Sequence, residues 1–312
     1  MNQHTPLARK GSLLERAASL YGLSVPSAAP RDAGPLEPVD LAPVTPPKPR
    51  AEPARARQAH NSIPNPALSP APKGPTAAID RDRLRKEGFV DPEAPTGPLV
   101  EEFRMVKRQL LAVPAGVPPE KSRTILVCSA KPDEGKTFCA VNLALSLAGE
   151  QDVEVLLVDG DFGKPEILPM LGLGGRREGL VDAIADPSRH PESLVVRTEI
   201  SGLSLLPAGS HASNVTELLA SERTREVLAL LATPTRIILF DSSPALIASP
   251  ASVLASHAGQ LVMVVRADQT SEADLREALD LLSSCPHVSL LLNGAGFAAS
   301  GRRFGSYYGY AQ

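Results

Sequence analysis

Long apolar runs are missing from this chain of 312 residues, and no stretch approaches the ~20 consecutive apolar residues that cross a bilayer. The first residues also lack the apolar centre of a signal peptide, so we expect the chain itself to be soluble and cytoplasmic. Long basic runs are absent and the formal net charge is −3, which argues against nucleic acid as a partner. Cys128, Cys139 and Cys285 lack metal-ligand spacing and are expected to be reduced thiols.

Proline, by contrast, is concentrated at one end. About half of the 31 prolines precede residue 80, and this predicts a disordered Pro/Ala-rich linker over 26–78. The segment before it, 1–25, contains an amphipathic stretch, SLLERAASLYG, that would either dock as a helix on a partner or fray in solvent. Residues 79–300 are long enough for one α/β domain. Residues 301–312 are expected to form a mobile tail rich in tyrosine.

A phosphate-binding loop lies between a predicted strand that begins at Thr124 and a predicted helix that begins at Lys136. The letters SAKPDEGKT match such a loop, except that Ala130 holds the place of the usual first glycine. In this kind of loop the lysine reaches the β- and γ-phosphates, and the hydroxyl of Thr137 is placed to bind Mg²⁺. Gly135 lets the backbone pass close to the nucleotide. The predicted nucleotide-binding residues of this segment are Lys131, Asp133, Glu134, Gly135, Lys136, Thr137 and Phe138.

Two further predicted strands end in acidic residues, at Asp159 and Asp241. Strand and helix alternate along the chain, and the carboxyl ends of parallel strands meet at a ligand crevice. We therefore expect these two carboxylates to share a Mg²⁺ shell with Thr137. Asp161 is the candidate to accept the proton of an attacking hydroxyl in phosphoryl transfer. The predicted fold is a three-layer α/β/α domain of the P-loop NTPase type with a mainly parallel sheet, in the deviant Walker A group.

Three features allow two interpretations each from the residues alone. Lys131 would either reach the phosphates of a neighbouring subunit, as in deviant Walker proteins, or be a solvated surface lysine. Three polar residues recur every third position on the predicted helix 98–112, and form either a subunit contact or an exposed surface with intrahelical ion pairs; they are Glu101, Arg104 and Lys107. The tail tyrosines would be either an adhesive end or a substrate; they are Tyr307, Tyr308 and Tyr310.

Together these motifs resemble those of the bacterial P-loop tyrosine kinases, and most closely the exosortase-associated tyrosine autokinases of exopolysaccharide clusters. The resemblance rests on three Walker motifs, SAKPDEGKT, LLVDGDFGKP and IILFDSSP. Three further features also resemble those of the family, namely the segment PAGSHASNVTELLAS, the polar helix and the tyrosine cluster SYYGY. It implies an ATP- and Mg²⁺-dependent kinase that phosphorylates its tail in trans within a ring, with Lys136, Asp161 and Lys131 as catalytic residues. It also implies that Asn293 contacts adenine.

The resemblance further implies partners. A membrane-embedded polysaccharide co-polymerase, or chain-length determinant, would activate the kinase and hold it at the inner membrane, and a cognate tyrosine phosphatase would fit the same system. Four positions depart from the family pattern, and we expect them to reduce activity or alter ring assembly without abolishing nucleotide binding; they are Lys107, Asp133, Gly163 and Ser243.

Two other functions stay open from the sequence. One is a positioning ATPase of the partition or septum-site type, which would dimerise on ATP and hydrolyse it. The other is a non-enzymatic, nucleotide-dependent scaffold for a polysaccharide co-polymerase. A GTPase is disfavoured because no Asn-Lys-x-Asp motif occurs.

Overall fold

The computed structural model describes residues 74–92, 97–112, 116–175, 177–210 and 212–295. These all belong to one compact unit, Ser62–Gln312, while the other unit, Met1–Asn61, lies outside the described residues. The predicted amphipathic segment, most of the 26–78 linker and the tyrosine tail also lie outside them. The proposed domain boundaries therefore stay predictions.

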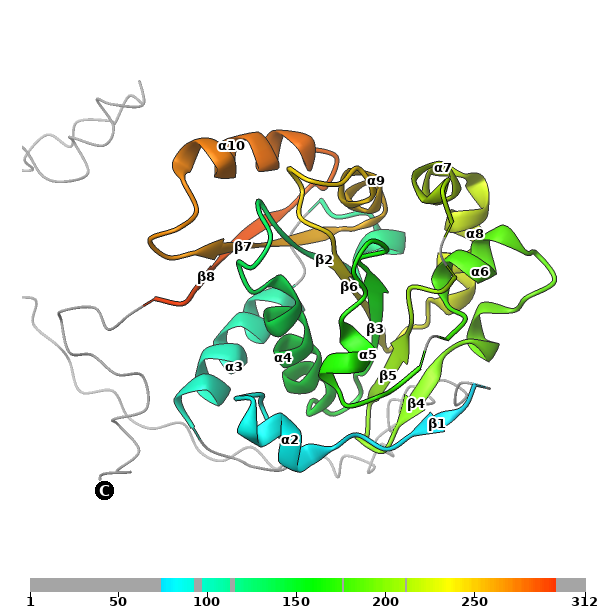
Figure 1. The fold of residues 1–312 in the computed structure, drawn as a ribbon, viewed down its shortest axis with the longest axis horizontal. Helices are drawn as coiled ribbons and strands as arrows, with labels where there is room; N and C mark the ends of the chain where they lie inside the picture. Colours follow the sequence, from blue (N-terminus) through cyan, green and yellow to red (C-terminus); the bar gives the residue numbers. More distant parts are fainter. Residues whose placement is uncertain (1–73, 93–96, 113–115, 176, 211, 296–312) are drawn as a thin grey trace, which may run out of the picture. The chain divides into compact units, whose positions relative to one another are not determined.

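Strands and helices alternate along most of the domain, as the sequence predicts (Figure 1). The strands are β1 (Thr76–Ala77), β2 (Thr124–Ser129), β3 (Glu154–Gly160), β4 (Val196–Thr198), β5 (Leu203–Leu206), β6 (Arg236–Ser242), β7 (Gln260–Arg266) and β8 (Val288–Asn293). The helices are α2 (Arg81–Lys86), α3 (Pro98–Leu111), α4 (Lys136–Ala148), α5 (Ile167–Met170), α6 (Leu180–Ala185), α7 (Val215–Ala220), α8 (Glu222–Leu231), α9 (Pro250–His257) and α10 (Glu272–Leu281). The short strands β1, β4 and β5 were not predicted, because segments of two to four residues carry too little periodicity.

The eight strands form one sheet in the order β1-β4-β5-β3-β6-β2-β7-β8. All neighbouring strands are parallel except β4 and β5, so the predicted mainly parallel sheet is confirmed. The order places β3, β6 and β2 side by side, and Asp159 pairs in register with Asp241. The three segments that carry the predicted nucleotide motifs therefore end at one edge of the sheet.

Alternate residues of the central strands enter two hydrophobic cores. Ile125 and Val127 of β2 face the core that α3 and α4 cover. Leu126 and Cys128 of the same strand face the opposite core, which α6, α8 and α9 cover. This follows from the period of two in a strand, and it produces the predicted three layers. Within the ranges described above, no helix is long and apolar enough to cross a membrane.

The polar residues of α3 do not share one environment. Lys107 is buried, and its Nζ donates to the carbonyl oxygen of Ser146 at 2.9 Å and pairs with Glu150 at 2.6 Å. Glu101 and Arg104 are only partly buried and form an ion pair within the helix. Lys107 therefore belongs to the contact between α3 and α4 rather than to the polar surface of α3, and a subunit contact through the other two stays a prediction.

Candidate nucleotide site

The phosphate-binding loop connects β2 to α4, as predicted. Gly135 has φ of +90°, in the region that favours glycine. A Cβ at this position would also lie 2.1 Å from Nδ2 of Asn293. Glycine is thus favoured here by the backbone conformation, and an added Cβ would force the amide of Asn293 to shift, whereas the sequence suggested only the approach of a nucleotide.

Glu134 holds the loop together from within. Its carboxylate is buried, accepts the backbone N–H of Lys131 at 2.9 Å and accepts the hydroxyl of Thr270 beyond β7. The side chain of Asn293 donates to the carbonyl oxygen of Glu134 at 2.9 Å. The contacts with Thr270 and Asn293 join segments far apart in the sequence, and neither was predicted.

A cavity of about 610 Å³ opens beside this loop. Six of the predicted site residues line it, namely Asp133, Gly135, Lys136, Thr137, Phe138 and Asp161. The opposite wall comes from the segment after β6, including Pro244, Ile247 and Ala248. This wall was not predicted, although Pro244 is the last residue of the Walker B segment IILFDSSP. Ile247 is 67% exposed, so the wall presents apolar surface to a ligand.

Lys136 and Asp161 meet inside this cavity. Nζ of Lys136 lies 2.8 Å from a carboxylate oxygen of Asp161 and 3.2 Å from the hydroxyl oxygen of Thr137. Burial acts to lower the pKa of Lys136, but the charge of Asp241 and the hydrogen bond to Asp161 outweigh it and raise the pKa overall. The ammonium therefore stays charged and suits phosphate oxygens.

Asp241 lies beneath the same residues and is fully buried, and neither of its carboxylate oxygens has a hydrogen bond of normal geometry within the described part of the chain. Burial raises its pKa to about 7, although the charge of Lys136 and the nearby hydroxyl of Thr137 lower it. Burying a carboxylate whose oxygens have no hydrogen bond costs free energy unless a cation pairs with it. Asp241 therefore fits the divalent cation that the motifs imply.

Asp159 is turned towards the backbone. Its two oxygens accept the N–H groups of Asp161 at 3.3 Å and of Ile167 at 3.2 Å. Burial and the charge of Asp241 raise the pKa of Asp159 to about 8. No group of three or more His, Cys, Asp or Glu residues in the described ranges could hold a metal by itself. A Mg²⁺ ion here would therefore take further oxygens from Thr137, phosphates and water.

Lys131 lies outside the cavity lining. Its ammonium pairs with Asp274 of α10 at 2.6 Å, and the side chain is 48% exposed. Glu134, Asn293, Asp159 and Asp241 also stay outside this lining. The tyrosines of the tail, Tyr307, Tyr308 and Tyr310, lie outside the described residues.

Comparisons with known proteins agree with this arrangement. No protein-family model matches the chain. The chain is 28% identical over 229 residues to EpsB of Ralstonia nicotianae, a candidate tyrosine-protein kinase, and 31% identical over 202 residues to the succinoglycan biosynthesis transport protein ExoP of Rhizobium meliloti. These matches cover 69% and 63% of this chain, but the chain spans only 29% and 24% of the two relatives. The tyrosine-protein kinase Wzc of Salmonella typhimurium is a further relative.

Among solved structures, the kinase domain of VpsO superimposes with a TM-score of 0.53 at 32% identity. The match covers 62% of this chain and 93% of that domain, so nearly the whole kinase domain has a counterpart here. EpsB, Wzc and VpsO are all described as kinases, and the three Walker segments of this chain meet at one edge of the sheet, as a P-loop site requires. The chain therefore belongs to the bacterial P-loop tyrosine kinase family.

Proposed function

We propose that this chain is an ATP- and Mg²⁺-dependent protein-tyrosine autokinase that regulates exopolysaccharide polymerisation or export. The observation that carries the proposal is the contact of Lys136 with Asp161 in a cavity that Thr137 also lines, above the buried Asp241. Four groups thus lie in this cavity or directly next to it. They are an ammonium group that can bind phosphates, a hydroxyl and a carboxylate that can bind a metal ion, and a second carboxylate that can accept a proton. Membership of the tyrosine kinase family supports the same activity.

The proposed reaction transfers the γ-phosphoryl group of ATP to a tyrosine. Lys136 holds the β- and γ-phosphate oxygens, and this draws its ammonium away from Asp161. The freed carboxylate of Asp161 accepts the phenolic proton as the tyrosine oxygen bonds to the γ-phosphorus, the bond to the β–γ bridging oxygen breaks and ADP leaves. Thr137, Asp241 and Asp159 would hold Mg²⁺, directly or through water, and the ion would supply charge neutralisation on the phosphates.

The remaining roles follow from the family and are proposed with the same function. The tail of one subunit enters the site of the next within a ring, with Glu101 and Arg104 at the subunit contact and Lys131 reaching the neighbour's phosphates. Asn293 contacts adenine. The name of ExoP supports a link to polysaccharide transport. We propose that a membrane polysaccharide co-polymerase activates the kinase at the inner membrane and that a cognate phosphatase opposes it.

The test is incubation of the purified full chain with labelled ATP and Mg²⁺. We expect labelled phosphotyrosine on the wild type and little on a variant with Tyr307, Tyr308 and Tyr310 changed to Phe. Lys136→Met should abolish nucleotide binding, because the cavity loses its buried cation and keeps only the exposed Lys164. Asp161→Asn should bind ATP and yet transfer phosphate at least ~100-fold more slowly, since general bases contribute 10²–10⁴-fold.

Three outcomes would contradict parts of the proposal. Unchanged labelling of the triple tyrosine variant rejects the tail as substrate. Unlabelled wild type, even with the cytoplasmic segment of its membrane partner added, rejects the kinase. ATP turnover without phosphotyrosine would favour the positioning ATPase, and intact cellular function of Asp161→Asn would favour the scaffold.

A further inference from the structure

A second cavity, of about 660 Å³, lies next to the nucleotide cavity. Phe162 and Gly163, in the loop after β3, line both cavities and so separate them. The second cavity is bounded elsewhere by α5, the segment that follows it, and the loop after β5. Asp159 is the one residue of this lining that has a role in the function proposed above.

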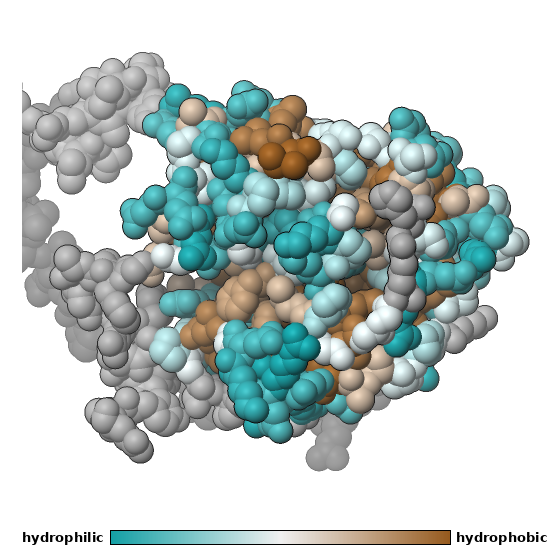
Figure 2. Space-filling view, viewed as in Figure 1, coloured by the Kyte–Doolittle hydropathy of each residue, from teal (hydrophilic) through white to brown (hydrophobic). Residues whose placement is uncertain are grey.

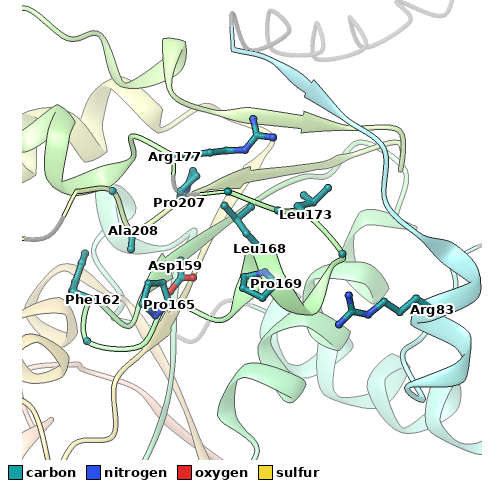
Figure 3. Close-up of a pocket in the computed structure, with 15 residues that line it drawn as sticks. Arg83, Asp159, Phe162, Pro165, Leu168, Pro169, Leu173, Arg177, Pro207 and Ala208 are labelled. Carbon is teal, nitrogen blue, oxygen red and sulfur yellow. The ribbon is translucent and has the colours of Figure 1, made fainter.

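The walls of the second cavity are mostly apolar, with a guanidinium on each of two sides. Leucine and proline side chains form the middle of the lining in Figure 3, where Arg83 comes from α2 and Arg177 from the opposite side. Figure 2 shows the charged helix α2 as a hydrophilic patch on the surface. The cavity therefore offers apolar surface together with two separate positive charges.

One of the two guanidinium groups has a donor without a partner in the described residues, and the other forms an exposed ion pair. Nε of Arg177 is buried and has no hydrogen-bond partner among the residues that the structure describes. Arg83 pairs with Glu87 at 2.8 Å, but the two side chains are 44% and 41% exposed, so the pair is screened by solvent and easily exchanged. The acid in the lining, Asp159, has both oxygens engaged by backbone N–H groups.

Apolar walls with guanidinium groups suit a ligand that has aromatic bodies and strongly anionic ends. A guanidinium binds phosphate oxygens through two parallel hydrogen bonds, and apolar walls bury the aromatic ring. Because the two arginines lie on different sides, one small anion would use only one of them. An extended segment with more than one aryl phosphate would use both.

We propose that this second cavity binds the phosphorylated tail, residues 306–310, as a product subsite beside the catalytic cavity. The proposal rests on the proposed function, since transfer to the tail is what creates its phosphotyrosines. Three tyrosines lie within four consecutive positions, 307–310, so a segment held by one phosphotyrosine keeps the others next to the nucleotide cavity. The tyrosines would then be phosphorylated in succession without complete release of the tail.

The test uses the full chain with its three tail tyrosines changed to Phe, so that its own tail cannot compete. The probe is a fluorescent synthetic peptide of residues 301–312 with phosphotyrosine at 307, 308 and 310, and binding is followed by fluorescence anisotropy. A non-hydrolysable ATP analogue with Mg²⁺ fills the nucleotide cavity. We expect the unphosphorylated peptide to bind the parent chain about tenfold or more weakly than the phosphopeptide does. The variants Arg83→Ala and Arg177→Ala should each bind the phosphopeptide about tenfold or more weakly than the parent does. In each case charge-assisted contacts are lost.

Arg85→Ala is the matched control. Arg85 lies on the same helix, carries the same charge and is absent from the cavity lining, so binding should change less than about twofold. Thermal melting of each variant checks that it is folded.

The proposal is overturned if Arg83→Ala and Arg177→Ala bind the phosphopeptide as the parent does. Displacement of the peptide by the ATP analogue would place its phosphates in the nucleotide cavity instead. Equal binding of a peptide with Glu at the three tyrosine positions would point to an acidic partner segment and reject the phosphorylated tail. Because the peptide is synthetic, the binding test can be carried out even if the chain is inactive as a kinase. If the chain is an active kinase but fails the binding test, only the product subsite is rejected and the proposed function is retained.

Discussion

The side chain of Asn293, at the end of β8, donates a hydrogen bond to the carbonyl oxygen of Glu134 in the phosphate-binding loop at 2.9 Å. The same amide nitrogen lies 2.1 Å from where a Cβ on Gly135 would be. The last strand of the described domain thus fixes the loop to which we assign phosphate binding. It also limits which residue can stand at position 135.

Gly135→Ala should lower the free energy of unfolding by more than the ~1–2 kcal/mol that an alanine in a left-handed conformation costs, because its Cβ also meets Asn293. Removing the amide in the double variant with Asn293→Ala should recover part of this loss, so the two changes should not add. Urea unfolding measures the energies. Gly88→Ala is the control, since Gly88 has φ of +81° and nothing within 4 Å of its added Cβ. Equal costs at 135 and 88 would refute the contact.

Asp133→Gly should strengthen nucleotide binding several-fold. Asp133 has φ of +62° and lines the nucleotide cavity, so glycine removes both an acid near the phosphates and a residue from a conformation that favours glycine. The dissociation constant of an ATP analogue, measured by calorimetry, checks this. Asp152 has the same φ but lies outside the cavity lining, so Asp152→Gly should change stability by less than about 1 kcal/mol and leave binding unchanged. Equal effects on binding at the two sites would contradict the explanation.

Lys107→Met should destabilise the chain by about 1–3 kcal/mol, because it leaves a buried carbonyl of Ser146 without its donor and Glu150 without its partner. The midpoint of chemical unfolding measures the loss. Arg108→Met is the control on the same helix, where the exposed side chain should matter by less than about 0.5 kcal/mol. A loss at 107 no larger than at 108 would show that the buried contact is unimportant.

Changing Glu101 and Arg104 to Ala should dissociate the proposed ring while leaving stability nearly unchanged. Their ion pair is partly exposed, and such pairs contribute only about 0–1 kcal/mol. Sedimentation velocity with nucleotide present reports the assembly state, and unfolding reports the stability. An unchanged assembly state would favour the simpler interpretation, in which the two residues form an intrahelical ion pair only.

The contribution of Asp241 to the stability of the nucleotide-free chain should fall as the pH rises from about 4 to about 7. The pKa of Asp241 is about 7 in the folded chain, against about 3.9 for an ordinary aspartate. Between these values the folded chain keeps a proton that the unfolded chain has released, so folding weakens as pH rises. Asp159, with a pKa of about 8, extends the trend by about one pH unit.

Asp241→Asn should therefore flatten this dependence in thermal melts taken from pH 5 to pH 8.5, because its amide does not ionise. Asp82→Asn, an exposed acid on α2, should leave the slope as in the wild type. At high pH, adding Mg²⁺ with an ATP analogue should stabilise the wild type more than it stabilises Asp241→Asn. A slope that does not depend on position 241 would exclude this carboxylate as its source.

The sequence by itself determined the features that depend on consecutive residues. The phosphate-binding loop, the helix that begins at Lys136 and the strand Val288–Asn293 were all predicted, and the structure contains them. Alternation of strand and helix also predicted the mainly parallel sheet. From that sheet followed the adjacency of Asp159 and Asp241, because parallel strands end at a common edge.

The tertiary structure decided what depends on the distance between residues far apart in the chain. Period alone put Lys107 on a polar surface with Glu101 and Arg104, whereas the packing of α3 on α4 buries it beside Glu150. Likewise, only the folded chain brings Asn293 to Gly135 and closes the nucleotide cavity with Ile247. Local patterns specify the backbone of each element and its buried face. Which side chains from separate elements meet is fixed only when the layers pack.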